Sequence, residues 1–247
     1  MAPGYRLGQG GRMETEQTSQ ARTVTTGGST VQEWTRELAE STGSPGGGAG
    51  AGLMLAIAAS LTSMVAGYTE AQEQEQEQAE PAHESPVDTI RSRARALRET
   101  ALRLADADAD ASNAFGAAFR LGKGEERTRA IREASLAAAR SSADLGRRAI
   151  EAIDDLAWLA EHGNPALISD VVVGLGALRA ALAGARTNVS FDLGSLRSTG
   201  LTLPEIHDAE PELWSAVGDL DRALARIDAL TARSDGRAAP TDAAGQP

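Results

Sequence analysis

A single carboxylate interrupts an otherwise apolar face of one predicted helix. The face is made of residues at alternating spacings of four and three, namely Ile90, Ala94, Leu97, Ala101, Leu104, Asp108, Ala111 and Phe115. This is the period of a helix face that packs against a partner helix, so Asp108 is expected inside the protein, with Asp106 and Asp110 solvated on either side. Burial raises the pKa of a carboxyl group, which makes Asp108 a candidate general acid/base near neutral pH. The alternative is a structural Asp108 that accepts hydrogen bonds from another helix.

Polar residues also stand at both ends of a second apolar helix, predicted from Ile168 to about Val189. Ser169 and Asp170 open this helix, and Asn188 follows Asp170 by 18 residues, or five full turns, so it shares the same face. The residues between them on that face are small, namely Gly174, Ala177, Ala181 and Gly184. Small residues let another helix approach closely, and the polar groups at the two ends then need buried partners. The alternative is an N-cap at Ser169 or Asp170 and a core Asn188 with satisfied hydrogen bonds.

A glycine-rich turn precedes the first long apolar segment. Gly46, Gly47 and Gly48 follow Pro45 at the predicted start of a helix, where free backbone N–H groups favour an anion or a polar ligand atom. The turn is not a phosphate-binding P-loop, because no Gly-Lys-Ser/Thr follows it. The alternative is a tight turn into a crowded buried helix.

The composition argues against several other kinds of chemistry. The chain has no Cys, which excludes disulfides and thiolate metal sites. His83, His162 and His207 lack the spacing of metal ligands and the carboxylates do not converge, so no metal site is expected. Neither a Ser/His/Asp arrangement nor a nucleophile elbow is visible in the sequence. A net charge of −11 argues against nucleic acid as the main partner.

The segment from Gly52 to Tyr68 is apolar enough to raise the question of a membrane span. It is interrupted by Ser60, Thr62 and Ser63 and is shorter than the roughly 20 residues that a span prefers. A central buried helix is therefore the preferred interpretation, with no membrane partner. The N-terminus lacks a basic region followed by an apolar run and a cleavage site, so no signal peptide is expected and the predicted location is cytoplasmic.

The elements that would position these residues are all helices, and a single all-α domain is predicted over residues 29–233. Thr30 with Glu33 makes a capping box for a short first helix, and Ser85-Pro86 begins the helix that carries Asp108. Another helix is expected over residues 125–161, with a candidate bend at residues 141–142, and a last one carries apolar residues from 213 to 227. Residues 1–28 and 234–247 are expected to be disordered, and residues 72–84 to form an acidic low-complexity loop.

Five stretches of the chain, in order and at matching separations across about residues 31–232, resemble the cyclodeaminase/cyclohydrolase family of folate enzymes. They are Ser44-Pro-Gly-Gly-Gly-Ala49 with Ser63-Met-Val-Ala66, Asp106-Ala-Asp-Ala109 through Arg120-Leu-Gly-Lys123, Gly163-Asn164, Ser169-Asp170, and Gly184-Ala-Arg-Thr-Asn-Val189. The family includes formimidoyltetrahydrofolate cyclodeaminase and methenyltetrahydrofolate cyclohydrolase.

The resemblance implies a compact multihelical fold with a buried central helix, a homodimer, and a folate bound in a groove between helices. It places the catalytic carboxylate at Asp108. The implied reaction joins the anilino nitrogen of formiminotetrahydrofolate to its formimino carbon and expels ammonia, whereas the cyclohydrolase branch adds water to the methenyl carbon. A tetrahydrofolate derivative is the implied substrate, and no prosthetic group is expected. The alternative is a divergent helical binding or interaction protein that kept the fold and lost catalysis.

The chain departs from the family pattern at several positions. A Lys-rich segment usually follows the buried helix, where this chain has a Gln/Glu repeat, and Asp192 stands where an Asn is often found. Arg91, Arg95 and Arg98 form a row beside the face that contains Asp108, and we expect this row to bind the carboxylates of the folate tail in place of the lysines. The alternative is a solvated basic face that balances the acidic loop.

Overall fold

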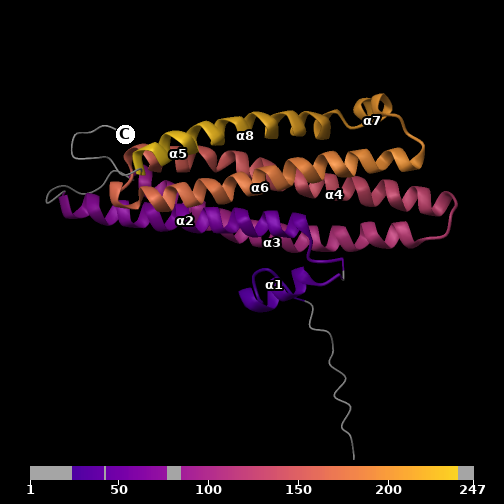
Figure 1. Ribbon diagram of the computed structural model, residues 1–247, viewed down its shortest axis with the longest axis horizontal. Coiled ribbons are helices and arrows are strands. Elements are labelled where there is room, and N and C mark those ends of the chain that lie inside the picture. Colours follow the sequence, from indigo (N-terminus) through magenta and orange to yellow (C-terminus); the bar gives the residue numbers. More distant parts are fainter. Residues whose placement is uncertain (1–23, 42, 77–84, 239–247) are drawn as a thin grey trace, which may run out of the picture.

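Long helices lie side by side and make up most of the described chain (Figure 1). The structure is a computed structural model that describes residues 24–41, 43–76 and 85–238. Its elements are α1 (Val31–Ala39), α2 (Gly47–Gln76), α3 (Pro86–Arg120), α4 (Glu125–Glu151), α5 (Ile153–His162), η1 (Pro165–Leu167), α6 (Ile168–Ser195), η2 (Leu196–Thr199), α7 (Leu203–Ala209) and α8 (Pro211–Ala238). No strand occurs among these described residues, and the predicted all-α single domain is confirmed.

α2 is the central helix, and both of its main neighbours, α3 and α6, run antiparallel to it. The contacts that define these directions join Gly48 to Asp108, Gly67 to Arg91, Ala51 to Gly184 and Leu61 to Gly174. Along α2, Leu55 and Val65 are completely buried. Burying one such side chain contributes about 1.5–3 kcal/mol, so the apolar run that suggested a buried helix does form the core.

Small residues allow the backbones of these helices to approach closely. A Cβ atom added to Gly52 would lie 2.7 Å from the Cβ of Ala105 on α3, and one added to Gly184 would lie 2.7 Å from the Cβ of Ala51 on α2. Neither contact could form with a larger residue unless the helices moved apart. The Ala- and Gly-rich sequence therefore sets the spacing of α2 from both partners.

Two segments, Gly47–Gln72 and Pro165–Thr199, are long and apolar enough to cross a membrane by length and composition. Both pack within the bundle, where Leu55 of α2 and Leu175 and Leu178 of α6 belong to the main hydrophobic core. The most apolar part of the α6 segment is less covered than that of α2, with 39% against 56% buried. An apolar surface on α6 thus remains uncovered in this chain alone.

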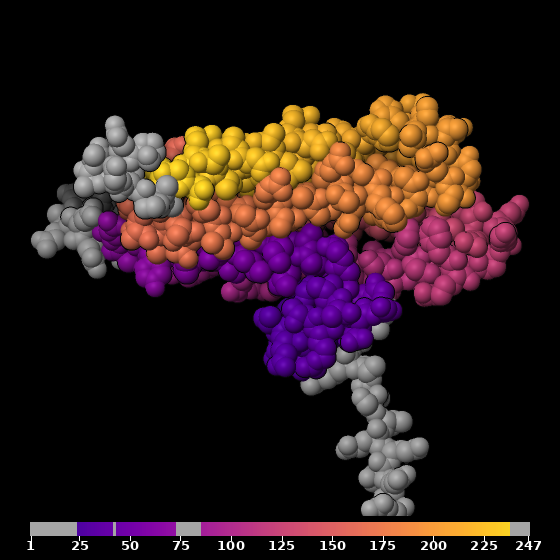
Figure 2. Space-filling model, viewed as in Figure 1, coloured from indigo at the N-terminus to yellow at the C-terminus, as the bar shows by residue number. Residues whose placement is uncertain are grey.

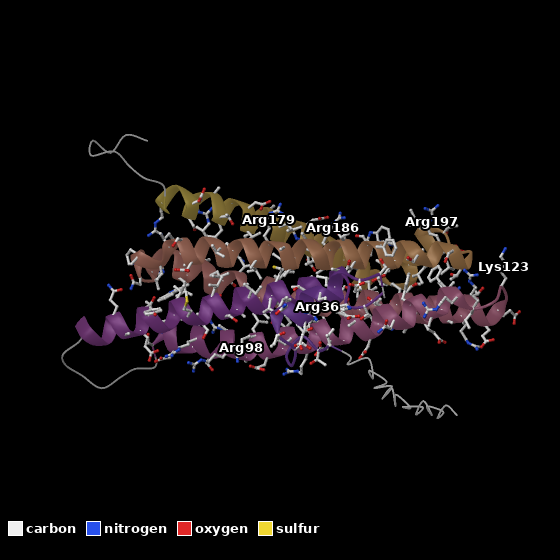
Figure 3. The ribbon with its side chains drawn as sticks, turned by 60° about the horizontal axis from the view of Figure 1, so that its bottom comes forward. Arg36, Arg98, Lys123, Arg179, Arg186 and Arg197 are labelled. Atoms are coloured by element: carbon white, nitrogen blue, oxygen red, sulfur yellow. The ribbon has the colours of Figure 1, made fainter. Side chains whose placement is uncertain are left out.

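α8 covers α6 and runs antiparallel to it. Leu220, Ile227 and Leu230 of α8 are buried against the core. At the exposed rim, Arg179 and Arg186 of α6 bind Asp228 and Asp221 of α8 at 2.5 and 2.8 Å (Figure 3). Exposed ion pairs contribute only about 0.2–1 kcal/mol each, so the apolar contact is the main attachment of α8.

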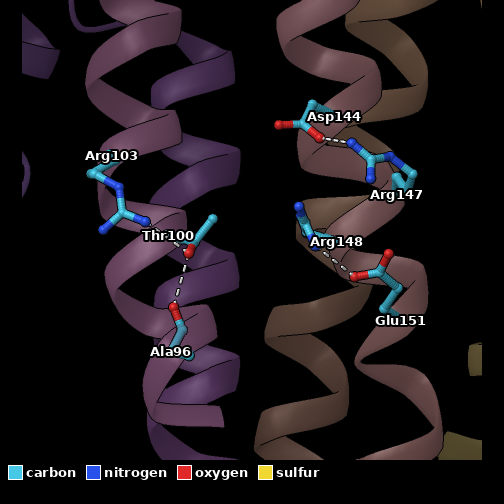
Figure 4. Close-up of polar contacts among 7 residues, drawn as sticks. All are labelled: Ala96, Thr100, Arg103, Asp144, Arg147, Arg148 and Glu151. Carbon is cyan, nitrogen blue, oxygen red and sulfur yellow. Dashed lines mark hydrogen bonds and ion pairs between the residues drawn. The ribbon is translucent and has the colours of Figure 1, made fainter. Parts of the chain in front are cut away.

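α4 continues through residues 141–142, where the sequence suggested a bend, and the helical run breaks instead at Ala152. The prediction was wrong because Ser142 is buried in the helix interface, where a small side chain favours close packing rather than a bend. Near the end of α4, Arg147 binds Asp144 and Arg148 binds Glu151 along the exposed surface (Figure 4). Each such pair stabilises the helix by about 0.2–0.5 kcal/mol.

Both predicted helix starts are confirmed. The Thr30 hydroxyl accepts a hydrogen bond from the Glu33 N–H at 3.2 Å, and the Glu33 carboxylate accepts one from the Thr30 N–H at 2.9 Å. At the start of α3, the Ser85 hydroxyl accepts a hydrogen bond from the Val87 N–H at 3.3 Å. Each cap contributes about 1 kcal/mol by satisfying an N–H group that the helix itself cannot bond.

The described structure extends beyond the predicted boundaries at three places. Residues 24–28 form a turn in which the Thr26 N–H donates a hydrogen bond to Asp106 at 2.6 Å. Asp106 is therefore half-buried and bonded, whereas the sequence predicted a solvated side chain. α2 continues to Gln76 within the expected acidic loop, and α8 continues to Ala238 with Ser234 buried. The rest of the three segments predicted to lack structure, residues 1–23, 77–84 and 239–247, lies outside the described residues.

Candidate functional site

The start of α2 meets α3 where a glycine faces Asp108. A Cβ atom added to Gly48 would lie 2.1 Å from Oδ1 of Asp108, so only glycine leaves room for this carboxyl group. No atom lies within 4 Å of a Cβ added to Gly47, and the nearest atom to one added to Gly46 is a carbonyl oxygen at 4.0 Å. Of the three predicted glycines, Gly48 is therefore the one in contact with the candidate catalytic residue.

Asp108 is buried, as its position on the apolar face predicts, with 6% of its surface exposed. Burial raises the pKa of its carboxyl group, and the Ala49 backbone N–H and the Ser112 hydroxyl act in the opposite direction as hydrogen-bond donors. Its Oδ2 atom is buried without any hydrogen-bond partner among the described residues. A purely structural carboxylate normally has both oxygens hydrogen-bonded, so Asp108 departs from that pattern with one unused acceptor atom.

A second buried carboxyl group, Asp192 of α6, belongs to the same part of the molecule. It is 8% exposed. Burial, and then the negative charge of Asp108, raise the pKa of Asp192 to about 7. The sequence reasoning did not select it as a site residue, although Asp192 lies one turn after Asn188 and shares its side of the helix.

Helix packing accounts for the meeting of these groups. Gly184 of α6 contacts Ala51 of α2 one turn after Gly48, and Asp192 follows two turns further along α6. Just beyond the start of α2, Phe115 of α3 and Phe191 of α6 approach with ring centroids 6.3 Å apart. In Figure 2 a hollow lies beside the start of α2, bounded by α6 and by the hairpin of α3 and α4.

Asn188 is half-buried and lies close to this site, but Ser169 and Asp170 do not. Asp170 precedes Asp192 by 22 residues, which is about 33 Å along a helix. The sequence put Asp170 and Asn188 on one face correctly, but a shared face five turns long is too extended for one small-molecule site. Within one subunit Ser169 and Asp170 therefore lie apart from Asn188 and Asp108, and their substrate-binding role stays a prediction.

The alternative role of Ser169 or Asp170, as the N-cap of α6, is wrong. Ser169 is exposed on the first turn of α6, and the chain enters that helix through η1. The residue that caps this turn is Asn164, whose side chain accepts a hydrogen bond from the Ala166 N–H at 3.0 Å. The Asn164 N–H in turn donates to Thr69 of α2 at 3.0 Å, which ties this end of the bundle together.

The arginine row lies along α3 at a distance from Asp108 and Asp192. Arg91, Arg95 and Arg98 line a groove of about 790 Å³ between α2 and α3, together with Ser63 and Tyr68. Arg98 precedes Asp108 by ten residues, about 15 Å along the helix, and it lies at the outer edge of the bundle (Figure 3). Two of the arginines already bind carboxylates, since Arg91 pairs with Glu70 and Arg98 with Glu99.

Another groove lies elsewhere. It has a volume of about 880 Å³ between α4 and α8, and its rim carries charges of both signs, including Arg147, Arg222 and Asp219. Neither Asp108 nor Asp192 lines it, so we do not assign the site there. Within the described ranges no group of three or more His, Asp or Glu residues could hold a metal ion.

The protein is thus an all-helical bundle in which a buried, incompletely hydrogen-bonded carboxylate of α3 lies against the start of the central helix α2. The family model described as formiminotransferase-cyclodeaminase matches residues 30–202. This match covers more than half of the chain, which therefore belongs to the formiminotransferase-cyclodeaminase family.

The comparison with solved structures agrees on the fold. The chain is similar to the crystal structure of formiminotetrahydrofolate cyclodeaminase from Thermotoga maritima at 2.80 Å resolution, with a TM-score of 0.66 and 21% sequence identity. The similarity covers 85% of this chain and 96% of that one. A search of the curated proteins finds no match.

Proposed function

We propose that this protein is a folate one-carbon enzyme that cyclises formiminotetrahydrofolate to methenyltetrahydrofolate and releases ammonia, with Asp108 as general acid/base. The observation that carries the proposal is the buried, unbonded Oδ2 of Asp108 beside Gly48. The family match supports the same class of substrate. No prosthetic group is required, because proton transfer suffices for this reaction.

The chemistry demands one proton acceptor and one proton donor. The anilino nitrogen attacks the formimino carbon and loses its proton, and the former imino nitrogen must gain a proton before it leaves as ammonia. A carboxyl group whose pKa is raised toward neutrality by burial can take part in both transfers. The rings of Phe115 and Phe191 supply an apolar wall nearby, suited to the flat rings of a folate.

Hydrolysis of methenyltetrahydrofolate to formyltetrahydrofolate is the related reaction to be tested beside it, with Asp108 taking a proton from the attacking water. One absorbance assay for methenyltetrahydrofolate separates the two reactions. Formation of this compound from formiminotetrahydrofolate supports the cyclodeaminase proposal, and its consumption without an amine substrate supports the cyclohydrolase. If neither reaction occurs while folates bind, the protein is a binding protein.

A non-catalytic helical binding or interaction protein is the second candidate function. The observation that favours it is the pairing of Arg91 with Glu70 and of Arg98 with Glu99, because arginines that are already paired offer less to the substrate tail. We nevertheless propose that Arg91, Arg95 and Arg98 bind the tail carboxylates. No ion pair involving Arg95 occurs among the described residues, and this side chain lines the groove.

We also propose that the protein is a homodimer formed through an apolar surface on α2 and α6. Val173 and Phe191 of α6 are 60% and 65% exposed, and Ile57 and Met64 of α2 are also exposed. The members of each pair are 18 and 7 residues apart, or about five and about two turns, so they share one side of their helix. A second subunit would cover these side chains.

The proposed setting is the cytoplasm, without a nucleic-acid or membrane partner, in keeping with the acidic composition.

A further inference from the structure

Two carboxyl groups are buried near the start of α2, and no basic side chain of the described residues neutralises them. Asp108 comes from α3 and Asp192 from α6, and they are 6% and 8% exposed. None of the ion pairs among the described residues includes either group. The contact of Gly48 with Asp108, the contact of Ala51 with Gly184 and the approach of Phe115 to Phe191 bring these stretches of α3 and α6 together.

Burying two like charges close together is energetically unfavourable. Removing one carboxylate from water is already unfavourable, and a second negative charge nearby adds repulsion. The pair avoids this when one of its two members stays protonated. In addition, the Oδ2 atom of Asp108 accepts no hydrogen bond from any residue that the structure describes.

We propose that Asp108 and Asp192 form a carboxyl pair that holds one proton at neutral pH, and that Asp192 is a second acid–base residue of the site. The part of this inference that concerns catalysis rests on the proposed cyclodeaminase function. The part that concerns the shared proton does not, because it depends only on burial and on the arrangement of the helices.

The surroundings determine which member keeps the proton. Asp108 receives hydrogen bonds from the Ala49 N–H and the Ser112 hydroxyl, which favour its charged form. Asp192 has no such donor among the causes of its shift, and burial together with the charge of Asp108 raises its pKa to about 7. No charged side chain other than Asp108, from any of the elements packed around Asp192, contributes to this shift. Asp108 is therefore the ionised member and Asp192 the protonated one.

This division suits the proposed reaction and balances its protons. The formimino group reacts in its protonated amidinium form, whose nitrogen carries two hydrogens. As the anilino nitrogen forms its bond to the formimino carbon, the amidinium nitrogen becomes a neutral amino group and the anilino proton passes to the carboxylate of Asp108. The carbon–nitrogen bond to the former imino group then breaks as Asp192 gives its proton to that nitrogen, which leaves as ammonia. The pair ends with one proton, as it began, but on the other carboxyl group. Transfer of that proton back to Asp192 restores the starting state.

The first experiment measures the pair without any assay of activity. The pKa of Asp192 is about 7 in the folded protein, whereas in the unfolded chain this carboxyl group has its ordinary pKa of 3.8. The free energy of unfolding therefore decreases as the pH rises between these values, and this loss requires an ionisable group at position 192. Asp192→Asn should raise the midpoint of urea unfolding at pH 8 and leave it nearly unchanged at pH 4.

Coupling to Asp108 is tested by a double-mutant cycle. In an Asp108→Asn background the negative charge that raises the pKa of Asp192 is gone, so the gain from Asp192→Asn at pH 8 should shrink. Asp155→Asn is the matched control, because Asp155 is also 8% exposed but binds Arg93. That substitution should lower the midpoint, since it leaves the guanidinium group without its partner. Additive effects of the two site substitutions would overturn the shared-proton proposal.

Activity supplies the second arm. Asp192→Asn should lower kcat by about 10²-fold or more and remove the decrease of kcat above pH 7 that deprotonation of Asp192 causes in the parent. An unchanged pH profile in the variant would overturn the acid–base role of Asp192. If the parent turns over neither folate while the double-mutant cycle shows coupling, the proposed function fails and the carboxyl pair stands.

Discussion

The carboxyl group of Asp108 fills the space that a side chain at position 48 would need. Its Oδ1 lies 2.1 Å from where a Cβ atom added to Gly48 would be. Gly48→Ala should therefore displace Asp108 or push α2 away from α3. We expect a large loss of turnover and a decrease of about 1–3 kcal/mol in the free energy of unfolding. Gly47→Ala is the matched control, since no atom lies within 4 Å of its added carbon. The control should keep activity, and equal behaviour of the two variants would contradict the contact.

Asp108→Asn removes the proton exchange and keeps the shape of the side chain. Turnover should fall by about 10²–10⁴-fold, the usual effect of losing a general acid/base. The free energy of unfolding at pH 8 should hold or rise, because a buried charge is removed. Steady-state kinetics and urea unfolding of the same preparation check both statements. Full turnover by the Asn variant would show that Asp108 is not catalytic.

The arginine row should affect binding of the substrate rather than chemistry. Arg95→Ala combined with Arg98→Ala should raise KM for polyglutamylated folate and leave kcat nearly unchanged, because both residues lie at least 15 Å or so from Asp108 along α3. The rise should diminish as salt is added, since the contact is electrostatic and near solvent. Arg147→Ala with Arg222→Ala removes the same total charge from α4 and α8 and serves as the control. Equal KM values for the row variant and the parent at low salt would mean that the row is only a solvated face.

The proposed dimer can be tested on α6 far from the acidic pair. Val173 is 60% exposed, so Val173→Glu should not disturb the fold of the subunit, but it would bury a charge in the proposed interface. Light scattering should show a dimer for the parent and a monomer near 25.6 kDa for the variant. Ala225→Glu, on an exposed position of α8, should remain dimeric. A parent that is monomeric at micromolar concentration would rule the dimer out.

Much of the architecture follows from local patterns that act over one or two turns. The capping residues Thr30 and Ser85 begin helices where predicted, because a side-chain oxygen can satisfy a free N–H group in any context. The alternation of four and three residues likewise placed Asp108 inside, since one side of a helix must be covered by its neighbours. The break at Ala152 has no such signal in its own residues, because alanine favours helix in general.

The composition of the site was decided by distances that only the packed helices define. The helical period predicts that Asp170 and Asn188 share a face, but it does not predict which point along that face contacts the start of α2. That point depends on the register of α6 against α2, set by the contact of Gly184 with Ala51, and it left Asp170 remote while it brought Asp192 to Asp108. The charge state of Asp192 is likewise a tertiary property, because its burial and its neighbouring charge come from residues distant in the sequence. The sequence alone determined that Asp108 would be buried, and the tertiary structure decided that Asp192 would be buried near it without a basic partner among the described residues.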